Sequence, residues 1–238
     1  MTAPRFFADD VSADRISLTG DEARHAVKVL RLRPGEEITI SDGAGTVAYA
    51  VVEEAATKLT AQVERRVTEP RPRPELVVFQ AIPTHGKLDL VVQKLTEVGV
   101  GAIHLFAAER SVARWDSGKG EAHAARLGEI AYQASKQSRR AWLARVVAPV
   151  RVSDIAPPAE TFALHEEASM RLGAALPDEP PDAVGLVVGP EGGLTEAEVS
   201  WFRERGVTPV TLGPLILRTE TAALVAASVI LARYGLIA

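Results

Sequence analysis

The chain has 238 residues, of which 47% are hydrophobic and 24% charged, as is typical of a globular protein with one or two domains. It has no cysteine, which excludes disulfides, thiolate nucleophiles and cysteine-ligated zinc. The five histidines lack a close metal-binding spacing, so we expect no metal site. No apolar run could span a bilayer and no signal peptide is recognisable, so we expect a cytoplasmic protein.

The N-terminal part is predicted to be a small domain made mostly of strands. Residues 35–54 are typical of two strands joined at the turn signal Asp42-Gly43, and residues 59–67 of a third. A short helix is predicted over 21–32. Its polar face is basic, which indicates either an ordinary solvated helix face or a surface that contacts phosphates; that face and the residue after it carry Arg24, His25, Lys28, Arg31 and Arg33.

Alternating prolines over 69–75 indicate a semi-rigid spacer, since proline fixes φ and favours an extended chain. We therefore predict a domain over 1–70, a Pro-rich linker over 71–75 and a larger domain over 76–238.

In the larger domain, predicted strands and helices alternate. Continuous apolar strands that alternate with helices are typical of a parallel sheet covered on both faces. The predicted strands are 76–82, 102–106, 144–150, 161–168, 183–189 and 208–213, and the predicted helices are 85–100, 121–140, 195–206 and 221–235. The last helix is apolar almost all round, which predicts burial on every side and hence a homodimer.

The most informative pattern is a pair of Gly-Pro breaks, Gly189-Pro190 and Gly213-Pro214, each between a predicted strand and a predicted helix. Open parallel sheets bind ligands beyond the carboxyl ends of their strands, so both loops are candidates for a binding site. A glycine-rich loop can also be a mere turn. The G-x-G-x-x-G and P-loop fingerprints are absent. The apolar triplet 215–217 favours a flat ring such as adenine over a phosphate.

Two other features bear on function. Residues 218–221, Arg-Thr-Glu-Thr, either cap the last helix or form an active-site cluster at its N-terminus. Residues 110–145 carry eight Lys and Arg against three acids, a zone of net charge +5 inside a chain of −4. Such a zone is compatible with a polyanion that meets one face of the protein.

Taken together, VGPEGGLTEAE (188–198) and LGPLILRTETAAL (212–224) make the chain strongly resemble the 16S ribosomal RNA uridine-N3 methyltransferases of the SPOUT superfamily. The likeness covers nearly the whole chain, with RFF (5–7), HAVKVLRLRPGEEI (25–38) and QSRR (137–140) in the family order. It implies an α/β fold: a SPOUT trefoil-knot domain with a parallel sheet, preceded by a PUA-like β-barrel. It also implies S-adenosylmethionine as cofactor, 16S ribosomal RNA as partner, and a dimer interface beside the cofactor.

The resemblance also suggests which residues form the site. The loops would enclose the cofactor with Leu164, His165, Gly189, Pro190, Gly192, Leu212, Gly213, Ile216, Leu217 and Thr219. Arg218 is predicted to stabilise negative charge on the uracil or a phosphate, and Glu220 to act as base or orienting residue, with Glu191 as the alternative. The predicted RNA contacts are Arg24, Lys28, Arg31, Arg33, Arg139 and Arg140.

The chain departs from many relatives at Leu215, where a polar or basic residue is common, and at Gln133 and Lys136, where acids are common. The predicted reaction is methyl transfer to N3 of an unpaired uridine, with alignment contributing more than any single side chain. The alternatives are a related methyltransferase with another RNA target, a non-catalytic RNA-binding or assembly factor, and a small-molecule α/β enzyme.

Overall fold

The computed structural model describes residues 3–84, 86–111 and 117–237, and the chain divides into two compact units. The first unit contains Met1–Arg71 together with Ser135–Leu143, and the second contains Pro72–Ala134 and Ala144–Ala238. The sequence prediction had placed residues 135–143 in the larger domain. Arg114 and Asp116, which belong to the predicted basic zone, lie outside the described residues.

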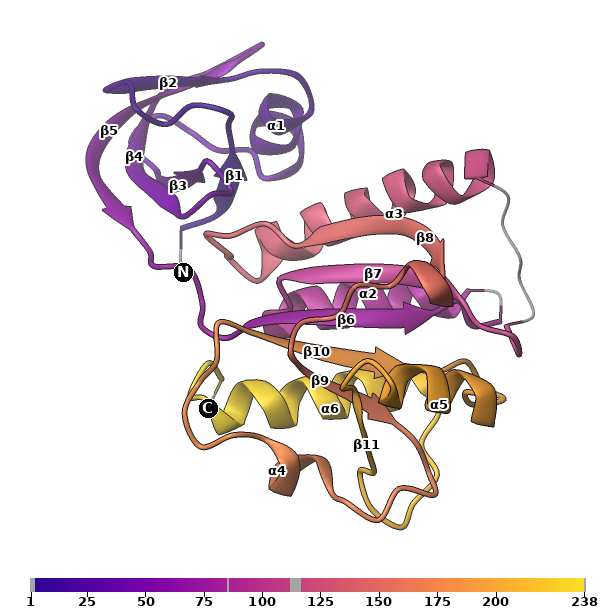
Figure 1. Cartoon of the computed structure of the whole chain (residues 1–238). Coiled ribbons are helices and arrows are strands. Elements are labelled where there is room, and N and C mark those ends of the chain that lie inside the picture. The colour runs from indigo at the N-terminus through magenta and orange to yellow at the C-terminus, as the bar shows by residue number, and fades with distance from the viewer. Residues whose placement is uncertain (1–2, 85, 112–116, 238) are drawn as a thin grey trace. The chain divides into compact units, whose positions relative to one another are not determined.

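The first unit is built on a curled five-stranded sheet (Figure 1). Its inner face packs a core that includes Phe6, Ile38, Ile40 and Leu59. Within the described residues the outermost strands do not pair, so the sheet is a half-barrel where a barrel was predicted. The strands, in spatial order, are β1 (Arg5–Phe7), β3 (Glu37–Ser41), β4 (Thr46–Ala55), β5 (Leu59–Thr68) and β2 (Arg15–Leu18).

The helix predicted over 21–32 is shorter and of two kinds. An α-helical turn, α1 (Gly20–Arg24), continues into a π-helical turn, η1 (His25–Val29), where the Leu30 amide donates to the His25 carbonyl five residues earlier. Lys28, Val29 and Leu30, at the end of this turn, are all exposed. Single π-turns of this kind occur often at functional sites.

The second unit contains a six-stranded sheet in which every pair of neighbouring strands is parallel, as the alternation predicted. The carboxyl ends of the strands therefore lie along one edge of the sheet. The strands, in spatial order, are β11 (Thr208–Val210), β9 (Glu160–Leu164), β10 (Ala183–Val188), β6 (Glu75–Ala81), β7 (Ala102–Ala107) and β8 (Arg145–Arg151).

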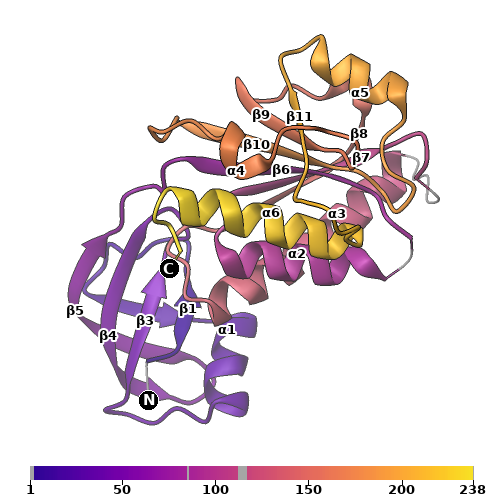
Figure 2. The ribbon, with the colours of Figure 1, turned by 90° about the horizontal axis from the view of Figure 1, so that it is seen from below.

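Helices cover both faces of this sheet. One face packs against α2 (Lys87–Val98), α3 (Ser117–Gln137) and α6 (Thr219–Arg233), and the opposite face against α5 (Glu196–Arg203) (Figure 2). Alternation along β6 explains the two cores, because Leu76 and Val78 join the first and Phe79 and Ala81 the second. The short helices are α4 (Leu172–Ala175) and the 3₁₀ turn η2 (Val152–Asp154).

Helix α6 is apolar, but it is not buried on every side in the single chain. Ala223, Ala226 and Ala227 are buried against the sheet and α2, whereas Val225 and Val229 are exposed. These two valines lie four residues apart and so share one face of the helix. Within the described ranges, no helix is both long and apolar enough to cross a membrane.

Candidate active site

A cavity of about 520 Å³ lies where β9, β10 and β11 end. The segments that follow these strands form its walls, which is the position expected for a ligand site in an open parallel sheet. The lining residues are Leu164, His165, Glu166, Val188, Gly189, Pro190, Glu191, Gly193, Val210, Thr211, Leu212, Gly213, Pro214, Leu215, Ile216, Leu217, Arg218, Thr219 and Ala222.

Both Gly-Pro loops thus line one cavity, although more than twenty residues separate them in the sequence. Of the ten residues predicted to bind the cofactor, all but Gly192 are among the lining residues. Of the three predicted catalytic residues, Arg218 and Glu191 line the cavity and Glu220 does not. The structure therefore brings together most of the predicted site and places Glu220 behind the wall.

The first loop, residues 189–193, is held from outside the cavity. Arg110, three residues beyond β7, donates from Nη1 to the Gly192 carbonyl at 2.7 Å. Gly192 therefore contributes a main-chain contact that holds the loop, although it does not line the cavity. A capping box in which Thr195 and Glu198 bond each other's backbone fixes the start of α5 just after the loop.

The second loop, residues 211–218, presents apolar side chains to solvent. Leu215 and Ile216 are 77% and 87% exposed, the two highest values among the large hydrophobic residues described. Gly213 adopts φ +127°, a conformation that side chains rarely allow, and its amide donates to Thr211 Oγ1 at 3.2 Å. Exposed aliphatic groups over a cavity form a surface against which a flat ring can pack.

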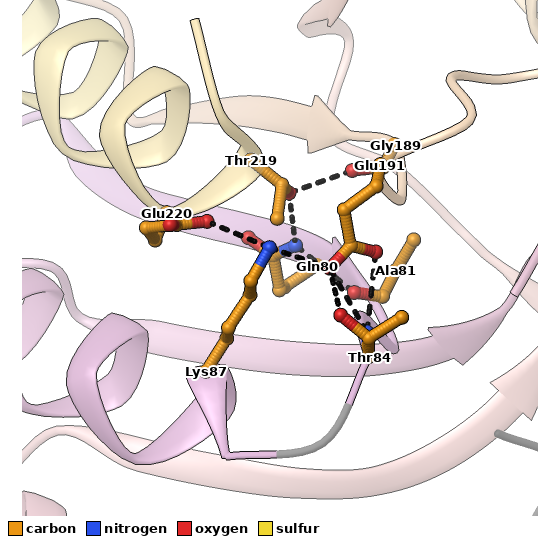
Figure 3. A network of polar contacts seen from close by, with 8 residues as sticks. All are labelled: Gln80, Ala81, Thr84, Lys87, Gly189, Glu191, Thr219 and Glu220. Carbon is orange, nitrogen blue, oxygen red and sulfur yellow. Dashed lines mark hydrogen bonds and ion pairs between the residues drawn. The ribbon is translucent and has the colours of Figure 1, made fainter. Parts of the chain in front are cut away.

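A chain of hydrogen bonds joins the first loop to the start of α6, directly after the second loop (Figure 3). Buried Thr219 donates from Oγ1 to the Gly189 carbonyl at 2.8 Å and accepts from Gln80 Nε2 at 3.1 Å. Gln80 is the penultimate residue of β6, opposite Val188 of β10, and its Nε2 also donates to the Ala81 carbonyl. Thr219, the first residue of α6, is therefore fixed directly to the first loop.

An ionic network lies beside this chain, on the same segments (Figure 3). Lys87 Nζ lies 2.8 Å from Glu191 Oε1 and 3.6 Å from Glu220 Oε2. The Thr84 amide donates to both Glu191 oxygens at 3.1 Å, and the Thr84 hydroxyl donates to Oε1. Burial opposes ionisation of Glu191, but the bonds from Lys87 and Thr84 outweigh it and lower the pKa to about 2.

Arg218 differs from these paired groups. Its side chain is exposed and lines the cavity, and among the described residues none accepts a hydrogen bond or an ion pair from its guanidinium. A cation that is held at a helix start with its donors free can bind an anion brought by a ligand. No side chain caps α6, so the structure does not show the capping role that residues 218–221 could have had, and the role of Arg218 stays a prediction.

Four residues of the site escaped the sequence analysis: Gln80, Thr84, Lys87 and Arg110. All follow or end parallel strands other than those with Gly-Pro loops. One feature of the sequence could have indicated them: they lie at or after the carboxyl ends of β6 and β7, the edge at which such sheets bind ligands. His85, between Thr84 and Lys87, lies outside the described residues.

The predicted RNA contacts all belong to the first unit. Lys28, Arg31 and Arg33 are exposed, Arg24 is exposed and paired with Asp21, and Arg139 is exposed. Arg140 differs, because burial lowers its pKa to about 10 and its Nε donates to the Trp142 carbonyl at 2.9 Å. Its guanidinium is therefore engaged in holding the loop that follows α3.

Lys136 and Gln133, the two positions where acids were expected from the resemblance, have different surroundings. Lys136 is 7% exposed, and its Nζ lies 2.7 Å from Glu22 Oε1 and 3.2 Å from His25 Nδ1. It holds the end of α3 to the first unit and does not alter an exposed charge. Gln133 is exposed and donates to Glu129 at 2.7 Å.

Comparison with known proteins agrees with this geometry. A family model described as an RNA methyltransferase domain matches residues 69–231, and one described as an RNA methyltransferase PUA domain matches residues 18–64. The ribosomal RNA small subunit methyltransferase E of Mycobacterium bovis is 37% identical, over 95% of this chain and 90% of its own. This chain belongs to the same family.

Other relatives support the assignment. The Bacillus subtilis member is 34% identical, over 92% of this chain and 90% of its own. The solved structure of the Neisseria gonorrhoeae enzyme bound to S-adenosyl methionine has a TM-score of 0.86 and 30% identity, covering 97% of this chain and 98% of that one. A Legionella pneumophila putative methyltransferase with bound cofactor also has a TM-score of 0.86, at 27% identity and 98% coverage of both chains. The fold is thus the α/β fold of these methyltransferases with an N-terminal PUA domain, while the SPOUT assignment and the trefoil knot stay predictions.

Proposed function

We propose that the protein transfers a methyl group from S-adenosylmethionine to N3 of a uridine in the 16S ribosomal RNA of the small subunit. The observation that carries the proposal is the single cavity formed by the two Gly-Pro loops, with the unpaired Arg218 on its wall. The relatives' names, and a relative's structure bound to S-adenosyl methionine, support the reaction class and the cofactor.

The residues of the cavity fit this cofactor. Its volume of about 520 Å³ lies within the range of small-molecule sites. Leu215, Ile216 and Leu217 would contact the adenine ring, and main-chain groups of residues 189–193 and 212–213 would bind its polar edges. Leu164 and His165 would form the remaining wall. When bound, the cofactor supplies a methyl group already activated by a sulfonium sulfur.

The chain's own residues would align the uracil and manage its charge. N3 must lose its proton before it forms the new bond to carbon, and this proton also makes the Watson–Crick pair, so the base must be unpaired or flipped. Arg218 lines the cavity and would stabilise the anion that results. Of the two carboxylates, Glu191 is unsuited to accept the proton, since its pKa is held near 2 by Lys87 and Thr84. Glu220 does not line the cavity, so of the two predicted roles, base or orienting residue, we propose that it orients its neighbours.

The first unit would bind the RNA backbone through the basic surface of Arg24, Lys28, Arg31, Arg33 and Arg139. Arg31 and Arg139 both adopt positive φ, 56° and 58°, a strained backbone state that for residues other than glycine is concentrated at functional sites. We propose domain boundaries at 70 and 76, with residues 135–143 serving the RNA-binding unit. Arg140 would act by holding that loop.

The oligomer and location follow from the same reasoning. Val225 and Val229 are exposed on one face of α6, an apolar face that a second copy of the chain would cover. We propose a homodimer through this face. We propose that the enzyme acts in the cytoplasm, where a substrate in the small ribosomal subunit would be found.

The proposed reaction is tested by incubating small-subunit RNA with the protein and S-adenosylmethionine, then digesting the RNA to nucleosides for mass spectrometry. The proposal expects 3-methyluridine, at a position that also stops primer extension because its pairing edge is blocked. A methyl group found on another atom, or in another RNA, would change the proposed target but leave the proposed cofactor unchanged. Cofactor binding without any methylated nucleoside would point to an RNA-binding or assembly factor.

A further inference from the structure

One ammonium group lies between two carboxylates at the point where the two cavity loops meet. Lys87 is the first residue of α2, Glu191 belongs to the first loop and Glu220 to the first turn of α6. Both carboxylates have an oxygen within 3.6 Å of Lys87 Nζ (Figure 3). None of the three side chains is more than 29% exposed, so water screens them only in part.

The two carboxylates depend on this cation to different degrees. Glu191 has further donors in the Thr84 amide and hydroxyl. Glu220 Oε2 is buried and accepts no hydrogen bond within the described residues, so Lys87 is its compensating charge there. Without the cation, two like charges a few ångströms apart would repel each other, and the loop and the helix start that carry them would separate.

No other cation in the described part of the chain is placed to compensate Glu191 and Glu220 in place of Lys87. Arg110 is bonded to the Gly192 carbonyl on the other side of the first loop. Arg218 points to the cavity, where it lines the wall. Arg126, a cation that contacts α2, is already paired with Asp89 of that helix.

We propose that Lys87 is a positioning residue for cofactor binding, which holds the loop of residues 189–193 against the start of α6 by compensating Glu191 and Glu220. The proposal deepens the proposed function and rests on it. Lys87 is not among the residues that line the cavity, so it acts through the two carboxylates and not by contact with the cofactor.

Calorimetric titration of S-adenosylmethionine into the full-length protein tests this role. Lys87→Met should weaken binding about tenfold, the effect expected for a charge-assisted contact. Lys87→Arg keeps the charge and should recover most of the affinity. Lys94→Met is the matched control, since Lys94 lies on the same helix and pairs with Glu97 at 2.8 Å, away from the cavity. It should change affinity less than about twofold.

A second substitution separates charge compensation from packing. In the double variant Lys87→Met with Glu220→Gln, one of the two uncompensated charges is gone, so affinity should rise at least about threefold above that of Lys87→Met alone. Thermal unfolding of each variant shows whether it is folded; if Lys87→Met alone is not, the Lys87→Arg and double variants decide.

Affinity for Lys87→Met equal to that of the parent, or no recovery in the double variant, would overturn the proposal. A parent protein that binds no S-adenosylmethionine at all would instead remove the proposed function.

Discussion

The hydroxyl of Thr219 is the smallest group whose loss should separate the two loops. It donates to the Gly189 carbonyl at 2.8 Å and accepts from Gln80 at 3.1 Å, and the side chain is 6% exposed. Valine has nearly the same shape, so Thr219→Val deletes these two bonds while it keeps the packing. At about 1 kcal/mol net for each bond, the free energy of unfolding should fall by about 2 kcal/mol.

The same 2 kcal/mol limits the effect on the cofactor. If the cofactor binds only when the two loops are joined, its apparent affinity is reduced in proportion to the fraction of molecules in which they stay joined. A loss of about 2 kcal/mol reduces that fraction, and hence the affinity for S-adenosylmethionine, by at most about 30-fold. We expect a loss of about tenfold in calorimetry, with stability followed by urea unfolding. Thr161→Val is the control: Thr161 is equally buried and donates to the Pro158 carbonyl at 2.6 Å, but it does not line the cavity. It should lose stability and keep its affinity. Parent-like affinity in Thr219→Val would refute the reasoning.

Three further predictions follow from the charged groups. Arg218→Ala should abolish methylation in the nucleoside assay yet change cofactor affinity less than about threefold, because its guanidinium lines the cavity without a partner among the described residues and is proposed to bind the substrate; full activity would remove its role. Glu191, whose pKa lies near 2 instead of the usual 4.5, stabilises the fold fully above pH 4.5 and loses that contribution as pH falls toward 2. Glu191→Gln should therefore be modestly less sensitive to acid in urea unfolding than the parent, and an identical pH dependence would contradict the pairing. Replacing Lys28 and Arg33 together by alanine should flatten the log–log slope of RNA affinity against salt by about 1.4–1.8, whereas an unchanged slope would exclude phosphate contacts there.

The sequence predicted those parts of the fold that depend on local pattern. Apolar strands between amphipathic helices predicted the parallel sheet, and the paired Gly-Pro breaks predicted which loops would form the cavity. Strands β1 and β2 were not predicted, since three or four residues are too few to establish an alternation.

What was missed depends on contacts between distant segments. In the sequence, Lys87 is an ordinary lysine at the start of a predicted helix. Its pairing with Glu191 and Glu220, more than a hundred residues away, exists only in the folded chain. Residues 135–143 comprise the end of α3, a helix that lies mostly in the second unit, and the segment after it. Only tertiary contacts such as that of Lys136 with Glu22 place them with the first unit. Helix α6 shows the same limit, because its composition predicted burial on every side, whereas Val225 and Val229 are exposed in the single chain.

The central claim is that the two Gly-Pro loops together enclose S-adenosylmethionine, and a crystal structure of the protein grown with this cofactor tests it most directly. The account predicts electron density for the cofactor between residues 189–193 and 212–219, with its adenine against Ile216 and Leu217. Density for the cofactor elsewhere on the molecule, with the space between these loops filled by solvent, would contradict it.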